Sequence, residues 1–446
     1  MESTTPTAAE TLWAAKAPEI CWQLHVLSSP DRHWQGRIVP IGPRGVVLGR
    51  ATEMVEAHDI GDPMLSRRHL ELRPGPRADV LDLRDLGSKN GTWRGAQRVA
   101  NVTLGHDGII RFGSSLAIVE GDLVGAAEYA HPTQCIPGRS GRARQLRADI
   151  QHAADGIAPV LLLGPTGVGK EFVVRELHAR SGRPGPLVFV GAPTLSESAF
   201  EAEFFGVIGT PGSSGLLDEA AEGTLVLDEI AELPLALQAK LLRFLESGRY
   251  RPVGAPQEIV SRTRIVATTN ADLEALAGQG KFRRDLLARL RCHVVAVPAL
   301  AERRSDLLEC ADVVAPLSAD NGQRWAQVLT PEALEALLHY GWPENLRELA
   351  TVLQALAPKA GPRPLARDDL PGWLLQATGP TGRSGHPVGQ LALTPDAAVL
   401  RRLLQRHYGN IAKVAAHYNR DRRQIYRWLE QAGVTDAEVA QFRRGP

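Results

Sequence analysis

The stretch Gly164–Lys170 has the residue types and the spacing to hold a phosphate chain. It reads Gly-Pro-Thr-Gly-Val-Gly-Lys, follows the apolar run Val160–Leu163 and precedes a helical pattern that begins at Phe172. In that setting glycines let backbone N–H groups close around phosphate oxygens, and the helix N-terminus adds the positive end of its dipole. Lys170 would supply a cation to the β and γ phosphates. The candidate contacts of a nucleoside triphosphate are Gly164, Thr166, Gly167, Val168, Gly169, Lys170 and Glu171.

Two adjacent carboxylates could supply the hydrolytic chemistry. Asp228 and Glu229 end the apolar run Leu225–Leu227, downstream of the phosphate loop. Asp228 would hold a magnesium ion, directly or through water, and Glu229 would polarise the attacking water. The pair predicts an ATPase with ATP and Mg²⁺ as cofactors.

The elements that must position these groups form an α/β domain. Continuous apolar runs occur at Val160–Leu163, Leu187–Val190, Thr224–Leu227 and Arg264–Ala267. Such runs are typical of strands that are buried on both faces of a parallel sheet. They alternate with longer helical patterns, which predicts an α/β fold with helices around the sheet.

Other regions flank this domain. Short apolar runs between turn residues, from Cys21 to about Glu120, predict a small all-β sandwich. A Pro- and Gly-rich stretch predicts a flexible linker, after which a helical pattern returns. The predicted parts are a flexible tail (1–18), an all-β sandwich (19–120), a connector (121–136), an α/β domain with an α-helical lid (137–358), a linker (359–392) and an all-α C-terminal domain (393–446).

Bulk composition excludes several classes of protein. The formal net charge of +1 means that any nucleic-acid surface must be local. No apolar run approaches the roughly 18 residues of a membrane span, and the four cysteines form neither a CxxC pair nor a disulfide ladder. The sequence predicts a cytoplasmic protein with reduced thiols and no membrane partner.

From Gly138 to Leu356 the chain resembles the AAA+ domain of sigma-54-dependent transcription activators of the NtrC class. Further motifs follow the phosphate loop in the family's order. Thr263–Asn270 is similar to the sensor I strand, Phe282–Leu290 to the arginine-finger segment and Gly341–Leu349 to sensor II. The family also has Glu at position 171, where many NTPases place Ser or Thr for magnesium.

The resemblance implies roles for four further residues. Asn270 would sense the γ phosphate, and Arg347 would report on the phosphates within the same chain. Arg283 and Arg289 would reach the nucleotide of a neighbouring subunit and stabilise charge in the transition state. Fingers supplied by a neighbour require a ring, so the resemblance implies a homo-oligomer, most often a hexamer.

Two departures from the family bear on function. Only Val207–Ser214 lies between Gly206 and Gly215, where the family carries a longer loop reading Gly-Ala-Phe-Thr-Gly-Ala that contacts the sigma factor. Gly191 stands where the family usually has an Asn that restrains the catalytic Glu. The sequence therefore predicts that sigma-54 remodelling is weak or absent and that ATP hydrolysis is weak or uncoupled.

Residues 45–113 resemble a forkhead-associated (FHA) domain. The match is carried by Gly49-Arg50, Ser66–His69 and Leu86–Thr92. Arginine forks and hydroxyl donors suit a phosphate, and His69 is expected to be a structural hydrogen bonder. The implied phosphothreonine-binding residues are Arg50, Ser66, Arg67, Lys89 and Asn90.

The stretch Tyr408–Gly433 resembles a Fis-type helix-turn-helix. Its apolar positions have helical spacing and would form a small core. Arginine and glutamine on a recognition helix can read base edges or position on phosphates; a solvated basic helix without DNA is the alternative. The candidate DNA contacts are Arg422, Arg423, Gln424, Tyr426 and Arg427.

Together these features predict a transcription regulator that binds a phosphothreonine-containing protein, ATP and DNA. RNA polymerase or a sigma factor is a further expected partner. A different class stays open, namely a phosphopeptide-binding adaptor whose AAA+ domain is a nucleotide-stabilised scaffold with little ATP turnover.

Overall fold

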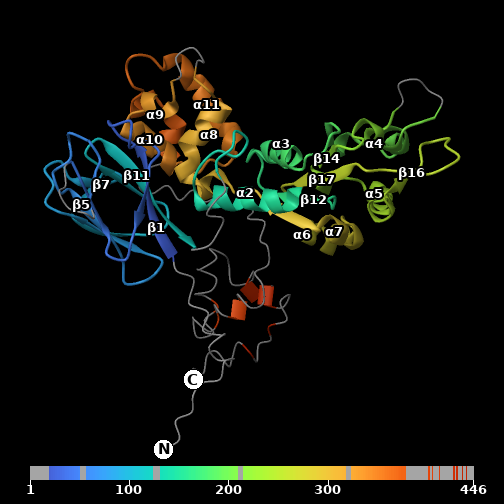
Figure 1. Cartoon of the computed structure of the whole chain (residues 1–446), viewed down its shortest axis with the longest axis horizontal. Coiled ribbons are helices and arrows are strands. Elements are labelled where there is room, and N and C mark those ends of the chain that lie inside the picture. The colour runs from blue at the N-terminus through green and yellow to red at the C-terminus, as the bar shows by residue number, and fades with distance from the viewer. Residues whose placement is uncertain are drawn as a thin grey trace, which may run out of the picture. The chain divides into compact units, whose positions relative to one another are not determined.

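The computed structural model describes residues 20–50, 57–123, 131–208, 214–317 and 323–377, together with isolated positions between 400 and 438. The chain forms two compact units, residues 1–386 and 387–446. The first unit contains an all-β sandwich, an α/β domain and a helical lid (Figure 1). Among the described residues, no helix is both long enough and apolar enough to span a membrane.

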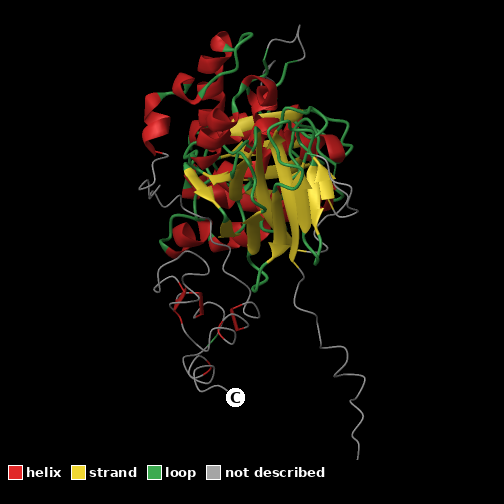
Figure 2. Cartoon of the chain, turned by 90° about the vertical axis from the view of Figure 1, so that its left-hand side faces the viewer, coloured by secondary structure: helices red, strands yellow, loops and turns green. Residues whose placement is uncertain are grey.

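Two β-sheets form the N-terminal sandwich, as the short apolar runs predict (Figure 2). The strand orders are β2-β1-β11-β10-β7-β8 and β4-β3-β5-β6-β9. The pairings are antiparallel except that of β3 with β4. The strands are β1 (Ile20–Ser28), β2 (Ile38–Ile41), β3 (Val46–Gly49), β4 (Ala57–Asp59), β5 (Leu70–Pro74), β6 (Leu81–Asp85), β7 (Thr92–Arg94), β8 (Gln97–Val99), β9 (Asn101–Leu104), β10 (Gly108–Phe112) and β11 (Ser115–Leu123).

Strands β10 and β11 are apolar on both faces. Ile110 and Val119 pack into the core between the two sheets. Ile109, Leu116 and Ile118 belong to a second core, which also contains side chains of the lid. Because side chains alternate across a strand, these residues show that the sheet is covered on both sides.

The α/β domain contains a parallel sheet in the order β13-β14-β17-β12-β18. Its strands are β12 (Val160–Leu163), β13 (Leu187–Gly191), β14 (Thr224–Asp228), β17 (Arg264–Thr269) and β18 (His293–Ala296), and the first four contain the predicted apolar runs. The sequence did not predict β18. The predicted burial on both faces is wrong for β13, because this edge strand has no fully buried residue. Around the sheet lie α2 (Gly141–Ala154), α3 (Lys170–Arg180), η1 (Ala192–Thr194), η2 (Glu201–Phe205), α4 (Leu216–Glu219), η3 (Ile230–Glu232), α5 (Leu235–Ser247), the hairpin β15 (Arg249–Tyr250) and β16 (Ile259–Val260), α6 (Leu273–Gly278) and α7 (Arg284–Leu290).

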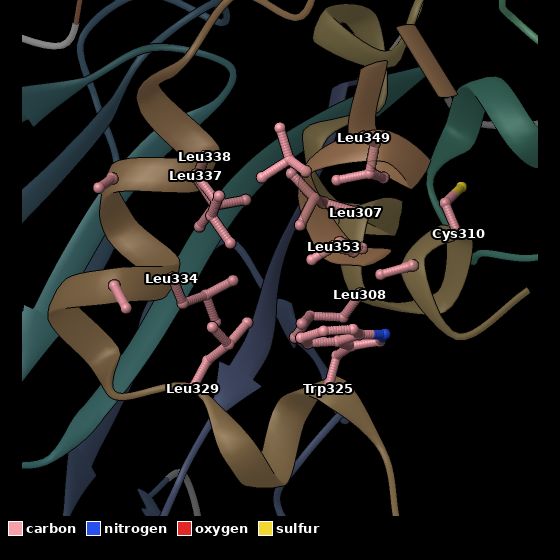
Figure 3. Close-up of a cluster of buried hydrophobic side chains, with 14 of the residues drawn as sticks. Leu307, Leu308, Cys310, Trp325, Leu329, Leu334, Leu337, Leu338, Leu349 and Leu353 are labelled. Carbon is pink, nitrogen blue, oxygen red and sulfur yellow. The ribbon is translucent and has the colours of Figure 1, made fainter. Parts of the chain in front are cut away.

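The lid, described over residues 300–317 and 323–377, packs around one apolar core (Figure 3). Its elements are η4 (Leu300–Glu302), η5 (Arg304–Asp306), α8 (Leu307–Val314), α9 (Trp325–Val328), α10 (Pro331–His339), α11 (Asn345–Leu356), η7 (Ala357–Lys359), η8 (Arg367–Asp369) and α12 (Gly372–Ala377). Leucines of α8, α10 and α11 point toward one another beside Trp325, whose indole N–H donates to the Ala315 carbonyl (2.7 Å). Leu27, Ile109, Leu116 and Ile118 of the sandwich complete this core. Burying each such side chain contributes about 2 kcal/mol, so sandwich and lid stabilise each other.

The start of the Pro- and Gly-rich stretch differs from the flexible linker that its composition predicts. Leu365, Leu370 and Leu374 are buried in the lid core, and α12 lies in the same stretch. These leucines stand among prolines and glycines, so composition alone does not reveal that they pack together. Residues 378–392 lie outside the described part of the chain.

The predicted helix-turn-helix lies in the second unit, where single positions are described. Ile411, Ile425, Trp428 and Leu429 are buried, as predicted for its small core. Tyr426 is 47% exposed. The other candidate DNA contacts lie outside the described residues and stay predictions: Arg422, Arg423, Gln424 and Arg427.

Glu309 of α8 should give the lid a pH-dependent stability. Its Oε2 atom is enclosed and has no hydrogen-bond partner among the described residues, and burial, with Asp306 nearby, raises the pKa of its carboxyl to about 7 from 4.5. The folded protein therefore keeps a proton that the unfolded chain releases. This contribution is complete below the unfolded pKa and is lost as the pH rises through the folded pKa.

We therefore expect Glu309→Gln to become more stable than the wild type as the pH rises from about 5 to 8, by up to about 3 kcal/mol. Urea unfolding of both proteins at each pH measures the difference. Glu246→Gln, an exposed change on α5, should show no such trend. A stability difference for Glu309→Gln that is the same at both pH values would contradict the expectation.

Candidate functional site

The phosphate loop lies at the carboxyl ends of the central strands, between β12 and α3. Gly169 caps α3 with a φ of 94°, and no described side chain caps the first turn, so its N–H groups are available to an anion. Gly167 has a φ of 74°, and a Cβ there would overlap the Glu344 carbonyl oxygen of the lid. Both positions need glycine, for backbone conformation and for close approach.

Four predicted residues meet beside this loop. Lys170 Nζ donates to the Gly164 carbonyl (3.0 Å) and lies 3.7 Å from Glu229 Oε1. The Asn270 backbone N–H donates to Glu229 Oε2 (3.3 Å), and Asn270 Nδ2 donates to Thr166 Oγ1 (2.8 Å). Burial lowers the pKa of Lys170, against the opposing effect of Glu229. The loop, the acidic strand end and sensor I thus converge on one point.

The acidic strand end is held by a residue that the sequence did not single out. Buried Thr268 donates its hydroxyl to Asp228 Oδ1 and accepts the Glu229 backbone N–H (3.4 Å). Glu229 has a φ of 52°, a strained conformation that such surroundings must enforce. Asp228 is exposed at the strand end, and a carboxylate there is a donor that suits Mg²⁺.

Asn345 of the lid is the second residue that the sequence did not single out. It is 1% exposed, and its Nδ2 donates to the Thr166 carbonyl (2.9 Å) while its Oδ1 accepts the Leu300 backbone N–H (2.8 Å). The next residue, Leu346, donates its N–H to the Gly167 carbonyl (2.9 Å). These bonds attach α11 to the phosphate loop. The one sequence signal for Asn345 is its position inside the sensor II motif, Gly341–Leu349.

Arg347 lies one residue further along α11. It is exposed, and its Cβ would lie 3.1 Å from a Cβ at Gly167. Its charge also contributes to lowering the pKa of Lys170, so Arg347 lies near the phosphate loop of its own chain. This placement agrees with a role in cis, which stays a prediction.

Three other predicted residues lie apart from this cluster. Arg283 is paired with Asp285 (2.8 Å), and Arg289 Nε donates to the Leu245 carbonyl (3.2 Å). Glu171 pairs with Arg175 (2.6 Å) on an exposed face of α3. Contact of the two arginines with a neighbouring subunit and of Glu171 with the nucleotide stays a prediction.

The shortened loop begins and ends at one place. A Cβ at Gly215 would overlap the Gly206 nitrogen, and the Ile208 N–H donates to the Val253 carbonyl (3.0 Å). Residues 209–213 lie outside the described part. At Gly191 a Cβ would have its nearest neighbour, Thr194 Cγ2, at 3.6 Å, so a side chain would fit there.

The candidate phosphothreonine residues gather on three loops of the sandwich. Lys89 donates its backbone N–H to Ser66 Oγ (3.1 Å), and Asn90 Nδ2 donates to the Met64 carbonyl (2.7 Å). The Arg50 backbone N–H donates to the Ser66 carbonyl (3.0 Å). The side chains of Arg50, Arg67 and Lys89 are exposed. Three cations beside a hydroxyl are suited to a phosphate.

His69 and Asp85 hold these loops in place by hydrogen bonds. His69 Nδ1 accepts the Ser66 N–H (3.2 Å), and its Nε2 faces the Gly91 carbonyl (3.1 Å), which confirms the expected structural role. Burial lowers the pKa of His69. Burial would raise the pKa of Asp85, but hydrogen bonds from Ser88 and Thr92 lower it.

Known families match the chain in the same order as these structural parts. The matches are an FHA domain over residues 46–113, a sigma-54 interaction domain over residues 136–296 and an AAA+ ATPase lid domain over residues 301–386. The nitrogen assimilation regulatory protein NtrX of Azorhizobium caulinodans is 33% identical, over 67% of this chain and 68% of its own length. The chain belongs to the sigma-54 activator family.

Other members of the sigma-54 activator family are similarly related. The regulatory protein AtoC of Escherichia coli is 35% identical over 63% of this chain and 64% of its own length; this chain thus spans just under two thirds of it. A crystal structure of NtrX from Brucella abortus in complex with ADP is 30% identical, covers 68% of this chain and 70% of its own, and has a TM-score of 0.49.

Replacing Asn345 by Ala should weaken nucleotide binding. The change leaves the Leu300 N–H and the Thr166 carbonyl without their partner, which costs about 1–3 kcal/mol when the groups stay buried. We expect the affinity for a non-hydrolysable ATP analogue to fall about 10-fold, measured by calorimetry. Asn101→Ala, on exposed β9, is the control. An unchanged affinity in a fully folded variant would remove Asn345 from the site.

Proposed function

We propose that this protein is a transcription regulator that binds phosphothreonine peptides through its FHA domain, ATP with Mg²⁺ through its AAA+ domain and DNA through its C-terminal helix-turn-helix. The grouping of Lys170, Glu229 and Asn270 around the phosphate loop carries the proposal. It lies at the carboxyl edge of a parallel sheet, where α/β proteins bind ligands. Homo-oligomerisation in a ring is part of the proposal, because Arg283 and Arg289 lie outside their own chain's cluster.

In this mechanism the chain's own residues exchange partners when the triphosphate binds. Lys170 Nζ leaves the Gly164 carbonyl and Glu229 for phosphate oxygens. The Glu229 carboxylate is then free to orient and polarise water. Asp228 would hold Mg²⁺, which neutralises charge on the phosphates. Asn270 already lies 2.8 Å from Thr166 of the loop, so it is placed to contact the terminal phosphate.

The base would enter an apolar cavity beside Gly169. The cavity is lined by residues such as Ile136 and Val173 of the α/β domain and Cys310 and Leu346 of the lid. Its volume is about 10 Å³, which is room for about one water. The side chains that line the cavity must therefore rearrange to admit a base.

The short loop supports an output other than sigma-54 remodelling. Its ends at Gly206 and Gly215 are in contact, and only eight residues, Val207–Ser214, lie between them. Such a turn lacks both an aromatic side chain and the length to project. We propose that the ring assembles on DNA and acts on transcription with little or no opening by the sigma-54 polymerase.

Gly191 favours a second candidate, a phosphopeptide-binding adaptor with little ATP turnover. The position has room for a side chain but carries none, so nothing at residue 191 can restrain Glu229. The adaptor would use ATP as a structural ligand. Turnover separates the two candidates.

ATP turnover by the wild type should exceed that of both Lys170→Ala and Glu229→Gln. Loss of the Lys170 cation should weaken ATP binding. Glu229→Gln should keep binding and lose about 100-fold in turnover, because general-base catalysis contributes at least that much. Phosphate release measures the rates, with the exposed change Glu246→Gln as control. Equal turnover in all four proteins would leave the adaptor as the function.

An open-complex assay with sigma-54 holoenzyme, promoter DNA and ATP tests the proposed output. We expect opening to stay close to the level without this protein, while an active family member opens the same promoter. Permanganate footprinting of the melted region gives the measurement. Robust ATP-dependent opening by this protein would refute the role assigned to the short loop.

A further inference from the structure

The FHA domain is built into the lid of the AAA+ domain. Ile109, Leu116 and Ile118 of its outer sheet face are at most 3% exposed and lie in the lid core. The Ser305 hydroxyl of the lid also donates to buried Glu120 of β11. A domain attached by both apolar and polar contacts cannot swing freely, so displacing the lid displaces the FHA domain with it.

A polar latch joins the phosphothreonine loop to α10 of the lid. Arg111 of β10 donates to Glu332 (2.8 Å) and lies 3.6 Å from Glu335. Glu335 also accepts the backbone N–H of Gly95 (3.0 Å), which follows β7. The guanidinium of Arg111 stacks 5.7 Å from the centre of the Trp93 ring. We call Arg111, Glu332 and Glu335 the latch.

Trp93 connects the latch to the candidate phosphothreonine loop. Its indole N–H donates to the Asn90 carbonyl (3.1 Å). Asn90 is one of the residues that should contact the peptide, and it is itself bonded to Met64 (2.7 Å) of the neighbouring loop. A peptide that reorders Asn90 therefore acts on Trp93, and through the ring on Arg111.

The other end of α10 leads to the phosphate loop of the AAA+ domain. Trp342, which is 1% exposed, donates its indole N–H to the Leu337 carbonyl of α10 (2.9 Å). Three residues later Asn345 bonds to Thr166 (2.9 Å). A short segment with two buried residues, Trp342 and Asn345, thus joins the latch helix to the backbone that would hold the triphosphate.

Nucleotide entry would act on residues beside this segment. The base cavity of about 10 Å³ is closed on the lid side by residues that include Cys310 of α8 and Leu346 of α11. A base needs far more room than one water, so the residues that line the cavity, Cys310 of α8 and Leu346 of α11 among them, have to give way when it binds. Since the FHA domain shares the lid core, this rearrangement reaches the latch.

We propose that phosphothreonine-peptide binding and nucleotide binding are coupled through the FHA–lid junction, with the latch as the element that transmits the coupling. The inference rests on the proposed function, because it assumes that both ligands bind. Coupling between two sites is reciprocal: each ligand changes the affinity of the other by the same factor. Couplings of this kind are typically about 5- to 150-fold.

The test measures both affinities on the full chain by calorimetry. One titration uses a non-hydrolysable ATP analogue with Mg²⁺, with and without a saturating degenerate phosphothreonine peptide. The other uses the peptide, with and without the analogue. We expect both ratios to agree and to be at least about fivefold. Arg111→Met and the double change Glu332→Gln with Glu335→Gln should bring the ratio close to one while each separate affinity stays within about twofold.

Arg84→Met is the matched control, since Arg84 is exposed on β6 of the other sheet; it should keep the wild-type ratio. If both ligands bind the wild type with a ratio of one, the coupling is refuted while the proposed function stands. A wild-type ratio in both latch variants refutes the latch. If no phosphorylated peptide binds, in preference to the unphosphorylated one, the proposed function fails and the coupling fails with it. Melting curves identify a latch variant that has lost its fold. The ratio measured with the other latch variant then tests whether the latch transmits the coupling.

Discussion

The second apolar face of strands β10 and β11 is the constraint on which the first unit depends. A sandwich needs one buried face on each sheet, yet Ile109, Leu116 and Ile118 make the other face apolar as well. Exposing them would cost about 2 kcal/mol each, so the lid must cover them. The lid in turn positions Asn345 against the phosphate loop. A packing requirement of the N-terminal domain therefore bears on the geometry of the nucleotide site.

In the nucleotide site, neighbouring residues position the side chains that would act on the nucleotide. Lys170, Glu229 and Asn270 come from three separate segments, and backbone conformations such as that of Glu229 at a φ of 52° aim them. Thr268 and Asn345 hold those segments without being reactive themselves. In the FHA domain His69 and Asp85 have the same task. Chemistry and support are thus divided between different residues of each site.

Sequence patterns revealed the parts of the molecule that are local in the chain. The runs at Val160–Leu163 and Arg264–Ala267 form strands, because burial on both faces leaves a continuous apolar signal. The phosphate loop could also be predicted from the sequence, because one short continuous segment contains all the backbone groups that would bind phosphate. Single supporting residues such as Thr268 leave no pattern in the sequence.

The junction between the FHA domain and the lid could not be predicted for a different reason. Arg111 and Glu332 stand more than two hundred positions apart, and no local rule pairs them. The leucines that fill the lid core beyond position 359 were hidden among prolines and glycines. Composition predicts a flexible linker for this stretch. Leu365, Leu370 and Leu374 are nevertheless buried, because they pack against helices that are distant in the sequence.

The contact between Gly206 and Gly215 makes this part of the AAA+ domain a position where one loop can be exchanged for another. Because the two ends already touch, the residues between them do not have to span any distance. Closing a longer loop costs little more, about 0.6 kcal/mol for each doubling of its length. Because Ile208 bonds to Val253 of the surrounding fold, it is the residues after Ile208 that can be removed or replaced without rebuilding the nucleotide site.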